Sequence, residues 1–423
     1  MSAPKLSANA GIFDLLWEKE QVAIRVDRIR SHSDSVTGEI TVKTLLPGHN
    51  VHVHQARLNL TSTSARRGLA KHCEERVPDS ALDWQAIIEE MAVMVLVKVR
   101  EGESVVCLHD VPPREGPRHR LAPLLLEGHP NYVYGDGGTG KSLVAAFCGV
   151  LVSSGAQHCG LTTMPGPVLY LDYETSAEEM HERVAAIEEG LGDPACSRIL
   201  YRFCVQPLAN DIEEIQKVVA ENEIEFVVVD SAGPALGGEK GDPKDPVIEY
   251  FRALRSLRIC SLTIDHVTKG EGGRKLPYGS VYKFNLARNV FELRKSQEAG
   301  EDEMYVGLYH RKANFGRLLS PTGFRLSLKE AADGTLSSVT FATARVRDVP
   351  ALMEGASARE RIVGFLLSEG PSTAAQIAVA LDMPATTVRV RLNEGNNRCF
   401  TRTSTGKEPT WAALAKNEGD KGC

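Results

Sequence analysis

The sequence lacks the features that would place it in a membrane or build it around disulfides or zinc. Its 423 residues include nine cysteines, and no two of them form a C-x-x-C pair. Scattered cysteines in an odd number are typical of small apolar side chains in a reducing compartment. No apolar run approaches the roughly 20 residues that span a bilayer, and no charged-then-apolar signal pattern opens the chain. We therefore expect a cytoplasmic protein with no membrane partner.

An excess of positive charge is also missing. The chain has 49 Lys and Arg against 55 Asp and Glu, a formal net charge of −6. This balance argues against a uniformly basic coat for nucleic acid, although it allows a local basic pore or patch. The hydrophobic fraction of 42% and the charged fraction of 25% are typical of a soluble globular protein. The length suggests about two to four domains.

What the sequence does contain is a complete phosphate-binding loop of the form G-x-x-x-x-G-K-[ST]. It follows a strand-like apolar run at 131–134 and opens into a helical run at 143–151. Such glycines let backbone N–H groups close on a phosphate at a helix N-terminus. A glycine-rich turn without a ligand is the alternative. We expect ATP and Mg²⁺ here, bound by Gly135, Asp136, Gly137, Gly138, Thr139, Gly140, Lys141 and Ser142.

Composition and periodicity divide the chain into four parts. Residues 1–110 mix strand-like and helical runs and predict an α+β domain, and the proline-rich segment 111–120 is a linker. Residues 121–347 alternate apolar strands with helices, which predicts a mainly parallel sheet, followed by segments without helices that predict an antiparallel extension. Residues 348–423 give helix, short helix, helix and hairpin, the order of a winged helix-turn-helix. A small helical protein-interaction module is the alternative there.

Polar residues at predicted strand ends supply the remaining candidates for a hydrolysis site. Asp230 ends an apolar strand and suits a carboxylate that binds Mg²⁺ with Ser142, although a strand-end Asp can also cap a turn. Glu174, just past another strand, can orient and deprotonate a water molecule, and Asp172 is a weaker candidate for that role. His266 can hydrogen bond to the γ-phosphate or cap a turn. Lys141 would reach the β- and γ-phosphates.

The motifs resemble those of the RecA-fold P-loop ATPases, most of all the RepA-like hexameric helicases of plasmids and phages, which are similar to DnaB-type replicative helicases. The resemblance covers roughly residues 120–320 and leaves out residues 1–110. Its later motifs are more specific than the phosphate loop, which is generic. They are Leu171-Asp172-Tyr173-Glu174, Val229-Asp230-Ser231, Ile264-Asp265-His266, Tyr278-Gly279-Ser280 with Asn285 and Arg288, and Arg311-Lys312-Ala313-Asn314-Phe315-Gly316.

The resemblance implies roles position by position. Glu174 would be the catalytic base, Asp230 the Walker B acid and His266 the γ-phosphate sensor. Arg311 or Lys312 would project into the site of a neighbouring subunit, and the sequence does not choose between them. Such a cation acting in trans would make hydrolysis depend on a homo-oligomeric ring, and the resemblance implies a hexamer. Arg183 would pack near the adenine, although a surface position on a helix is the default for an arginine.

Two kinds of segment predict contact with DNA. The glycine-rich loops at 237–244 and 269–275 follow strand ends and could grip a phosphate backbone, or could be plain surface loops. Aromatic residues that could stack on bases are sparse near the second loop, where only Tyr278 and Tyr282 lie. Tracking of the single-stranded DNA backbone is therefore favoured over base recognition. Arginines also cluster in the C-terminal module, where they could contact duplex DNA. The DNA-binding candidates are Lys269, Arg274, Lys275, Arg389, Arg391, Arg398 and Arg402.

These observations predict a ring-forming, ATP-driven DNA helicase or translocase of a mobile element or phage. The alternative keeps ATP hydrolysis and DNA binding but makes the protein a recombination accessory or regulator that does not separate strands. A protein with a decayed phosphate loop is disfavoured, because Lys141, Ser142, Glu174 and Asp230 are all chemically intact.

Overall fold

The computed structural model has two parts, each folded around its own core. It describes residues 2–9, 11–31, 34–46, 51–78, 81–102, 105–192, 198–237, 244–268, 276–277, 281–404, 406 and 408–414. Met1–Gly116 with Ala209–Ile224 form one compact unit, and Pro117–Leu208 with Glu225–Cys423 form the other. Among these described residues, no helix is long and apolar enough to cross a membrane. The four-part division of the sequence stays a prediction.

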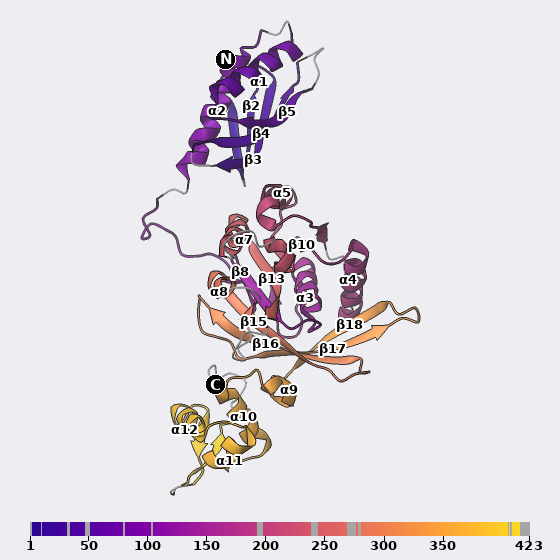
Figure 1. Cartoon of the computed structure of the whole chain (residues 1–423), viewed down its shortest axis with the longest axis vertical. Helices are drawn as coiled ribbons and strands as arrows, with labels where there is room; N and C mark the ends of the chain where they lie inside the picture. The colour runs from indigo at the N-terminus through magenta and orange to yellow at the C-terminus, as the bar shows by residue number, and fades with distance from the viewer. Residues whose placement is uncertain are drawn as a thin grey trace. The chain divides into compact units, whose positions relative to one another are not determined.

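The first unit contains an antiparallel sheet with two helices packed against it (Figure 1). Buried and exposed side chains alternate along β3 and β4, because successive side chains of a strand point to opposite faces. Trp84, Ile87, Ile88 and Met91 are buried in the core of this unit, as their helical spacing predicts. The elements are β1 (Lys5–Asn9), β2 (Ile12–Trp17), β3 (Val22–Ser31), β4 (Val36–Thr44), β5 (His52–Asn59), α1 (Thr63–Arg76) and α2 (Trp84–Glu101).

The second unit is organised by a ten-stranded sheet in the order β11-β10-β12-β13-β8-β15-β16-β17-β18, with β14 beside β13. The strands from β11 to β15 are parallel, and β8, β10 and β12 are buried along their whole length. Helices cover them, as a parallel sheet requires: α3 contacts β8, β10, β12 and β13, and α7 contacts β8. The elements are β8 (Pro130–Gly135), α3 (Lys141–Ser154), β10 (Val168–Asp172), α4 (Ala177–Leu191), β11 (Ile199–Phe203), β12 (Phe226–Asp230), α6 (Ala232–Leu236), α7 (Lys244–Ser256), β13 (Cys260–Thr268), β14 (Leu276–Pro277) and α8 (Val281–Leu286). Helix α5 (Leu208–Glu221) follows β11 in the chain but is grouped with the first unit. A small separate sheet holds β6 (His119–Ala122), β7 (Leu125–Leu126) and β9 (Thr162–Thr163).

The other half of this sheet is antiparallel, with one difference from the prediction. The segment from Asn289 was expected to be wholly antiparallel, but β15 pairs in parallel with β8 and only its other edge is antiparallel, with β16. Helix α4 lies against β18 (Figure 1), so closely that a side chain at Gly190 would lie 2.0 Å from the carbonyl oxygen of Val339. The strands are β15 (Asn289–Ser296), β16 (Glu303–Ala313), β17 (Thr322–Glu330) and β18 (Leu336–Ala344).

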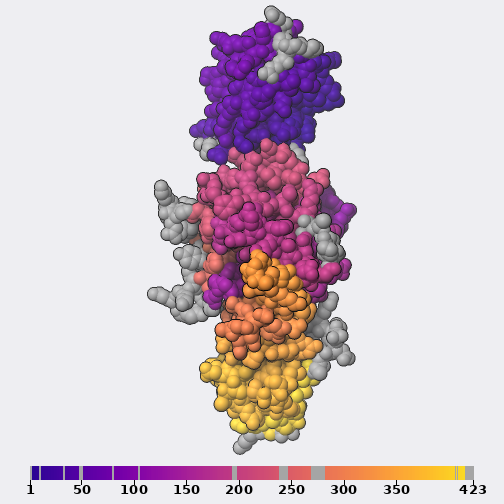
Figure 2. Space-filling model, turned by 90° about the vertical axis from the view of Figure 1, so that its right-hand side faces the viewer, coloured from indigo at the N-terminus to yellow at the C-terminus, as the bar shows by residue number. Residues whose placement is uncertain are grey.

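The C-terminal module follows the antiparallel strands and has a small core of its own around Phe400 and Trp411. In the space-filling view its surface (yellow) adjoins that of the strands (orange) (Figure 2). Capping boxes at Ser357 and Thr373 fix where its helices α10 and α11 begin. Its winged-helix assignment stays a prediction. The elements are the turn η1 (Val346–Asp348), α9 (Pro350–Met353), α10 (Ala358–Ser368), β19 (Ser372–Thr373), α11 (Ala374–Ala380), α12 (Ala385–Glu394), β20 (Phe400–Arg402) and β21 (Thr410–Ala413), with the strands ordered β19-β21-β20.

The cysteines are mostly buried thiols. Burial raises the pKa of both Cys73 and Cys148 to about 12, so these groups stay protonated and apolar. Cys399 is disulfide-bonded, which differs from the expectation that every cysteine is reduced. The free cysteines of the described residues are Cys73, Cys107, Cys148, Cys159, Cys204 and Cys260.

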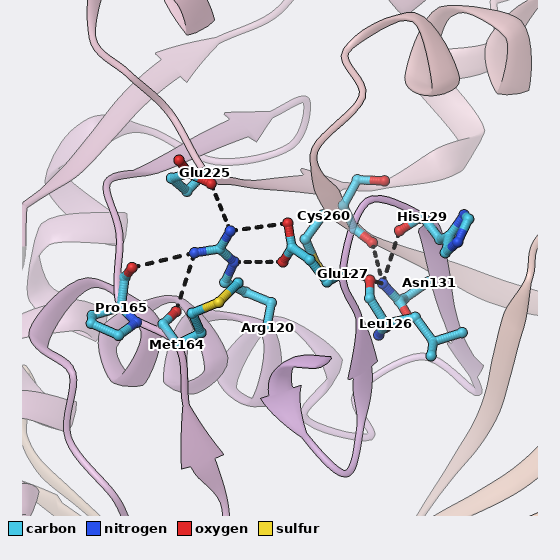
Figure 3. A network of polar contacts seen from close by, with 10 residues as sticks. Arg120, Leu126, Glu127, His129, Asn131, Met164, Pro165, Glu225 and Cys260 are labelled. Carbon is cyan, nitrogen blue, oxygen red and sulfur yellow. Dashed lines mark hydrogen bonds and ion pairs between the residues drawn. The ribbon is translucent and has the colours of Figure 1, made fainter. Parts of the chain in front are cut away.

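A buried arginine, Arg120, lies at the edge of the sheet where the parallel strands begin (Figure 3). The side chain of Arg120 is 4% exposed. Its guanidinium donates to both carboxylate oxygens of Glu127 (2.7 and 3.0 Å) and to Glu225 (2.6 Å). It also donates to the carbonyls of Met164 and Pro165, both at 3.3 Å. Every guanidinium nitrogen therefore has an acceptor, which offsets the cost of burying the charge.

Asn131, at the start of β8, extends this network (Figure 3). Its side-chain amide donates to the carbonyls of Leu126 (3.1 Å), His129 (3.0 Å) and Ser261 (3.0 Å), and its oxygen accepts from the N–H of Leu126 (2.8 Å). One buried side chain thus fixes the phosphate-loop strand against the loop before it and against β13. A fully bonded polar group of this kind defines position without leaving capacity for a ligand.

Candidate active site

The predicted phosphate loop connects β8 to α3 at the opposite edge of the sheet. Gly138 and Gly140 have φ values of +67° and +84°, which glycine adopts without strain. Gly135 lies against β15, where a side chain would come within 2.4 Å of the carbonyl oxygen of Leu293. The Lys141 ammonium group is buried and donates to the carbonyls of Gly135 (3.0 Å) and Asp136 (2.8 Å). The loop is therefore shaped as a cradle with a cation inside it.

Strand register brings the other predicted residues to the same edge. Asp172 at the end of β10 pairs with Asp230 at the end of β12, and His266 of β13 pairs with Gly135 of β8. The carboxyl ends of parallel strands face one side of a sheet, which is where ligands bind in open α/β folds. Residues that are far apart in the chain thus become neighbours of the loop.

Asp230 lies beside the serine with which the sequence pairs it. The Tyr170 hydroxyl donates to the Asp230 carboxylate at 2.7 Å, and the Ser142 side chain is close enough to the same carboxylate to lower its pKa. Burial raises the pKa of Asp230, and the negative charges of Asp172 and Glu174 act in the same direction. Tyr170 was not identified from the sequence, because a tyrosine inside an apolar strand carries no motif.

Glu174 lies just beyond β10 and contacts two other strand ends. Its Oε1 accepts a hydrogen bond from the Ser231 hydroxyl and lies 3.8 Å from Nε2 of His266. The side chains of Glu174 and His266 are 41% and 47% exposed, so water reaches both of them. Ser231 was missed as a functional candidate, although it stands next to Asp230 in the sequence. The three groups form a polar face that water can approach.

Asp172, the weaker candidate for a base, has other partners. Its Oδ1 accepts from the backbone N–H groups of Glu174 (2.9 Å) and Thr175 (3.0 Å), and its Oδ2 accepts from the Thr175 hydroxyl (2.5 Å). These bonds close the turn that carries Glu174. Asp172 is thereby better placed to position Glu174 than to accept a proton from water.

A buried ion pair next to His266 was not anticipated. Asp265 accepts from the ammonium group of Lys283 (2.9 Å) and from the Tyr132 hydroxyl (2.6 Å), with both charged side chains at most 3% exposed. The other oxygen of Asp265 accepts from the backbone N–H of His266 at 2.9 Å. This cluster holds the end of β13, and hence His266, in place.

Arg183 lies on α4, and its Nη1 is buried without a hydrogen-bond partner among the described residues. Its positive charge lowers the pKa of Tyr170, although burial, the larger effect, raises that pKa well above its usual value. Arg183 is therefore near Tyr170, the residue that donates to Asp230. Its predicted contact with adenine stays a prediction.

Arg311 and Lys312, near the end of β16, are both engaged within the chain. Arg311 pairs with Glu292 (2.7 Å) and donates to the carbonyl of Gly355 (2.7 Å). The Lys312 ammonium group donates to three carbonyls at the end of α8, at 2.6 to 3.0 Å. A role in trans for either cation would require it to exchange these partners.

The predicted DNA contacts divide by position. Lys269, Arg274 and Lys275 lie outside the described residues. The four arginines of the C-terminal module, Arg389, Arg391, Arg398 and Arg402, are exposed on α12, on β20 and on the turn between them.

The residues present fit ATP and Mg²⁺. The backbone cradle begins a 14-residue helix whose N-terminal dipole favours an anion. The oxygen atoms of Ser142 and Asp230 are ligands that Mg²⁺ prefers. Within the described residues no group of three His, Cys, Asp or Glu side chains could hold a metal. A Mg²⁺ ion here would therefore need phosphate and water oxygens to complete its shell.

Comparison with known proteins agrees with this chemistry. Residues 102–272 match the family model described as AAA domain. A solved structure, a KaiC-like protein from the hyperthermophilic archaeon Pyrococcus horikoshii OT3, is similar over 55% of this chain and 100% of its own, with 18% identity and a TM-score of 0.37. A search of curated proteins found no match. The phosphate loop, the aligned acids and the match to the AAA domain model together support a P-loop ATPase core in this chain.

Proposed function

We propose that this protein is an ATP-dependent DNA helicase or translocase, of the kind that serves replication of a mobile element or phage. It would hydrolyse ATP at the interfaces of a homo-oligomeric ring and move on single-stranded DNA. The observation that carries the hydrolysis step is the gathering of Lys141, Ser142, Asp230, Glu174 and His266 at one edge of the sheet.

The chemistry follows from these positions. Lys141 and the loop amides bind the phosphates, and Ser142 with Asp230 hold Mg²⁺, which supplies charge neutralisation when bound. Glu174, oriented by Ser231 and exposed to solvent, takes a proton from the attacking water. The water oxygen bonds to the γ-phosphorus, the bond to the β,γ-bridging oxygen breaks, and ADP and phosphate leave. His266 contacts the γ-phosphate and senses its loss.

The ring part of the proposal concerns Arg311 and Lys312. Their positions on β16 allow one of them to reach a neighbouring subunit once its partners in the chain are released. Mixing two inactive variants tests this: Lys141→Ala disables its own site, and Arg311→Ala or Lys312→Ala disables the neighbour's. Recovery of activity on mixing identifies the cation that acts in trans. No recovery with either would exclude a shared site.

The DNA part draws support from the exposed arginines of the C-terminal module. Arg391 of α12 is paired with Glu394 (2.7 Å), and Arg389 is exposed on the same helix. Arg402 of β20 lies over the Trp411 ring at 4.9 Å. Charge reversal at Arg389 and Arg391 should weaken duplex binding and flatten its salt dependence. Unchanged binding by this double variant would remove the module from the DNA interface.

Strand separation is tested with a forked DNA. ATP hydrolysis should rise with single-stranded DNA, and the fork should open only with hydrolysable nucleotide. Glu174→Gln should stop both, whereas Glu178→Gln, at an exposed position in the first turn of α4, is the matched control and should change neither. Hydrolysis that ignores single strands, with no fork opened, would contradict a helicase.

One observation favours the alternative function. The pairing of Arg311 with buried Glu292 keeps it within its own chain, as expected of an ATPase whose sites work without a neighbour's cation. In that case the protein would be a RecA-like, DNA-binding ATPase acting as a recombination accessory or regulator. ATP hydrolysis independent of protein concentration and of mixed subunits, together with DNA binding, would support it.

A further inference from the structure

A recessed cavity of about 450 Å³ lies between the antiparallel strands and α10, and no residue of the phosphate loop lines it. Its lining includes His310 and Arg311 of β16, Arg317, and Arg359 and Glu360 of α10. Three of these five side chains are positively charged arginines, and a fourth, His310, becomes positively charged when it is protonated. Both the sheet and the C-terminal module contribute to the walls.

His310 presents an unused donor in this cavity. Its Nδ1 accepts the backbone N–H of Leu319 at 3.0 Å. Burial lowers the pKa of His310 and outweighs a contact with the Lys312 backbone, which raises it. The neutral ring is therefore favoured, and its proton must lie on Nε2. Nε2 is buried and has no partner among the described residues. A buried N–H without an acceptor is costly, so its presence calls for an explanation.

Arg359 of α10 presents a second unused donor among the residues that line the cavity. Its Nε is buried and has no hydrogen-bond partner among the residues that the structure describes. Its other guanidinium atoms reach only to within 3.9 Å of the Glu394 carboxylate, which pairs more closely with Arg391 at 2.7 Å. Two buried donors from separate elements therefore line one space.

The charged side chains around the cavity also carry an excess of positive charge. Glu292 is shared by Arg294 (2.6 Å) and Arg311 (2.7 Å), and Glu394 is shared by Arg359 and Arg391. Each carboxylate thus leaves one guanidinium charge uncompensated. The single acid that lines the cavity, Glu360, is held in its capping box, where it accepts the N–H of Ser357 at 2.8 Å.

From these contacts we propose that the cavity is a phosphate-binding site, which takes a terminal phosphate group between His310, Arg311 and Arg359. A terminal phosphate offers several free acceptor oxygens and two negative charges, matching the unused donors and the excess positive charge. A diester phosphate of a DNA backbone, flanked by sugars, fits a recessed space less well. The phosphate comes either from solution or from a nucleotide carried by a second copy of this chain, and the second source rests on the shared site of the proposed function. Its binding would join the C-terminal module to the ATPase sheet.

Calorimetric titration with inorganic phosphate at constant ionic strength tests the site without DNA or hydrolysis, so failure here is distinct from failure of the proposed function. The parent for this test carries Lys141→Ala, which disables the phosphate loop. Adding Arg359→Gln should weaken phosphate binding about tenfold or more, and Arg359→Lys should restore part of it. Arg347→Gln is the matched control, since the exposed fractions of Arg347 and Arg359 are 44% and 41% and Arg347 does not line the cavity.

A second arm distinguishes the two sources of phosphate. Sedimentation with a non-hydrolysable ATP analogue and intact Lys141 measures nucleotide-driven association of the chain. If Arg359→Gln weakens association but isolated phosphate does not bind, the phosphate arrives on a second copy. If phosphate binding falls and association does not, it comes from solution. If neither measurement changes, or if only binding of an oligonucleotide changes, the proposal is wrong.

Discussion

Buried charges occur at both ends of the parallel strands, but they are bonded in opposite ways. At the starting edge, every guanidinium nitrogen of Arg120 has an acceptor from Glu127, Glu225 or a backbone carbonyl. At the ending edge, Lys141 donates to carbonyls of its own loop. The pKa of Asp230 is raised there by burial and, to a smaller extent, by the neighbouring acids. A closed network stabilises the fold, whereas the open one keeps bonding capacity for a ligand.

The largest effect should come from the open edge. Glu174→Gln removes the proton acceptor and should lower ATP hydrolysis by about 10²- to 10⁴-fold, with little change in nucleotide affinity. Phosphate release and binding of a fluorescent nucleotide measure the two quantities. A variant that keeps more than about a tenth of the activity would show that another group is the base.

Lys141→Ala should lower hydrolysis by about 10²- to 10³-fold, the usual loss when one charged donor to a reacting phosphate is removed. Thermal unfolding without nucleotide should stay unchanged or rise, because Lys141 is a buried cation whose burial lowers its pKa. Activity assays paired with calorimetry check both statements. A large fall in melting temperature would instead place Lys141 among the structural residues, with Arg120.

The closed edge should respond in the opposite manner. Arg120→Ala leaves Glu127 without its cation and should lower the free energy of unfolding by about 3–5 kcal/mol. The KM for ATP of the remaining folded protein should not change. The control is Arg325→Ala, whose pair with Glu303 is about half exposed on both sides and should cost under about 1 kcal/mol. Equal losses from the two variants would erase the distinction between buried and surface pairs.

The smallest effect concerns pH. The folded pKa of Asp230 is raised by burial above its ordinary value of 3.8, so folding favours its neutral form. This contribution to stability is present below the unfolded pKa and is lost as pH rises through the folded pKa. Asp230→Asn, which is always neutral, should therefore unfold at higher urea than the parent at neutral pH without Mg²⁺. The difference should narrow as the pH is lowered, and a difference independent of pH would contradict the shift.

The sequence predicted much of the ATPase core but little of what supports it. The phosphate loop and the ends of β10, β12 and β13 were found where motifs and apolar runs indicated them. The sequence did not predict the roles of Tyr170, Ser231 or the Lys283–Asp265 pair. Each of these groups acts through a partner that is distant in the sequence or lies in a different element. The parallel pairing of β15 with β8 was also missed, since strand direction is not encoded in an apolar run.

The sequence by itself determined the chemistry of nucleotide binding, because a phosphate loop is contiguous and its glycines, lysine and serine act within one turn. The tertiary structure alone decided how the remaining groups are used. Register placed Asp172 opposite Asp230 and His266 opposite Gly135. Packing paired Arg311 with Glu292 and put His310 and Arg359 in the lining of one cavity. The physical reason is that burial and the bonding of a charge depend on neighbours in space, which only the packed chain specifies.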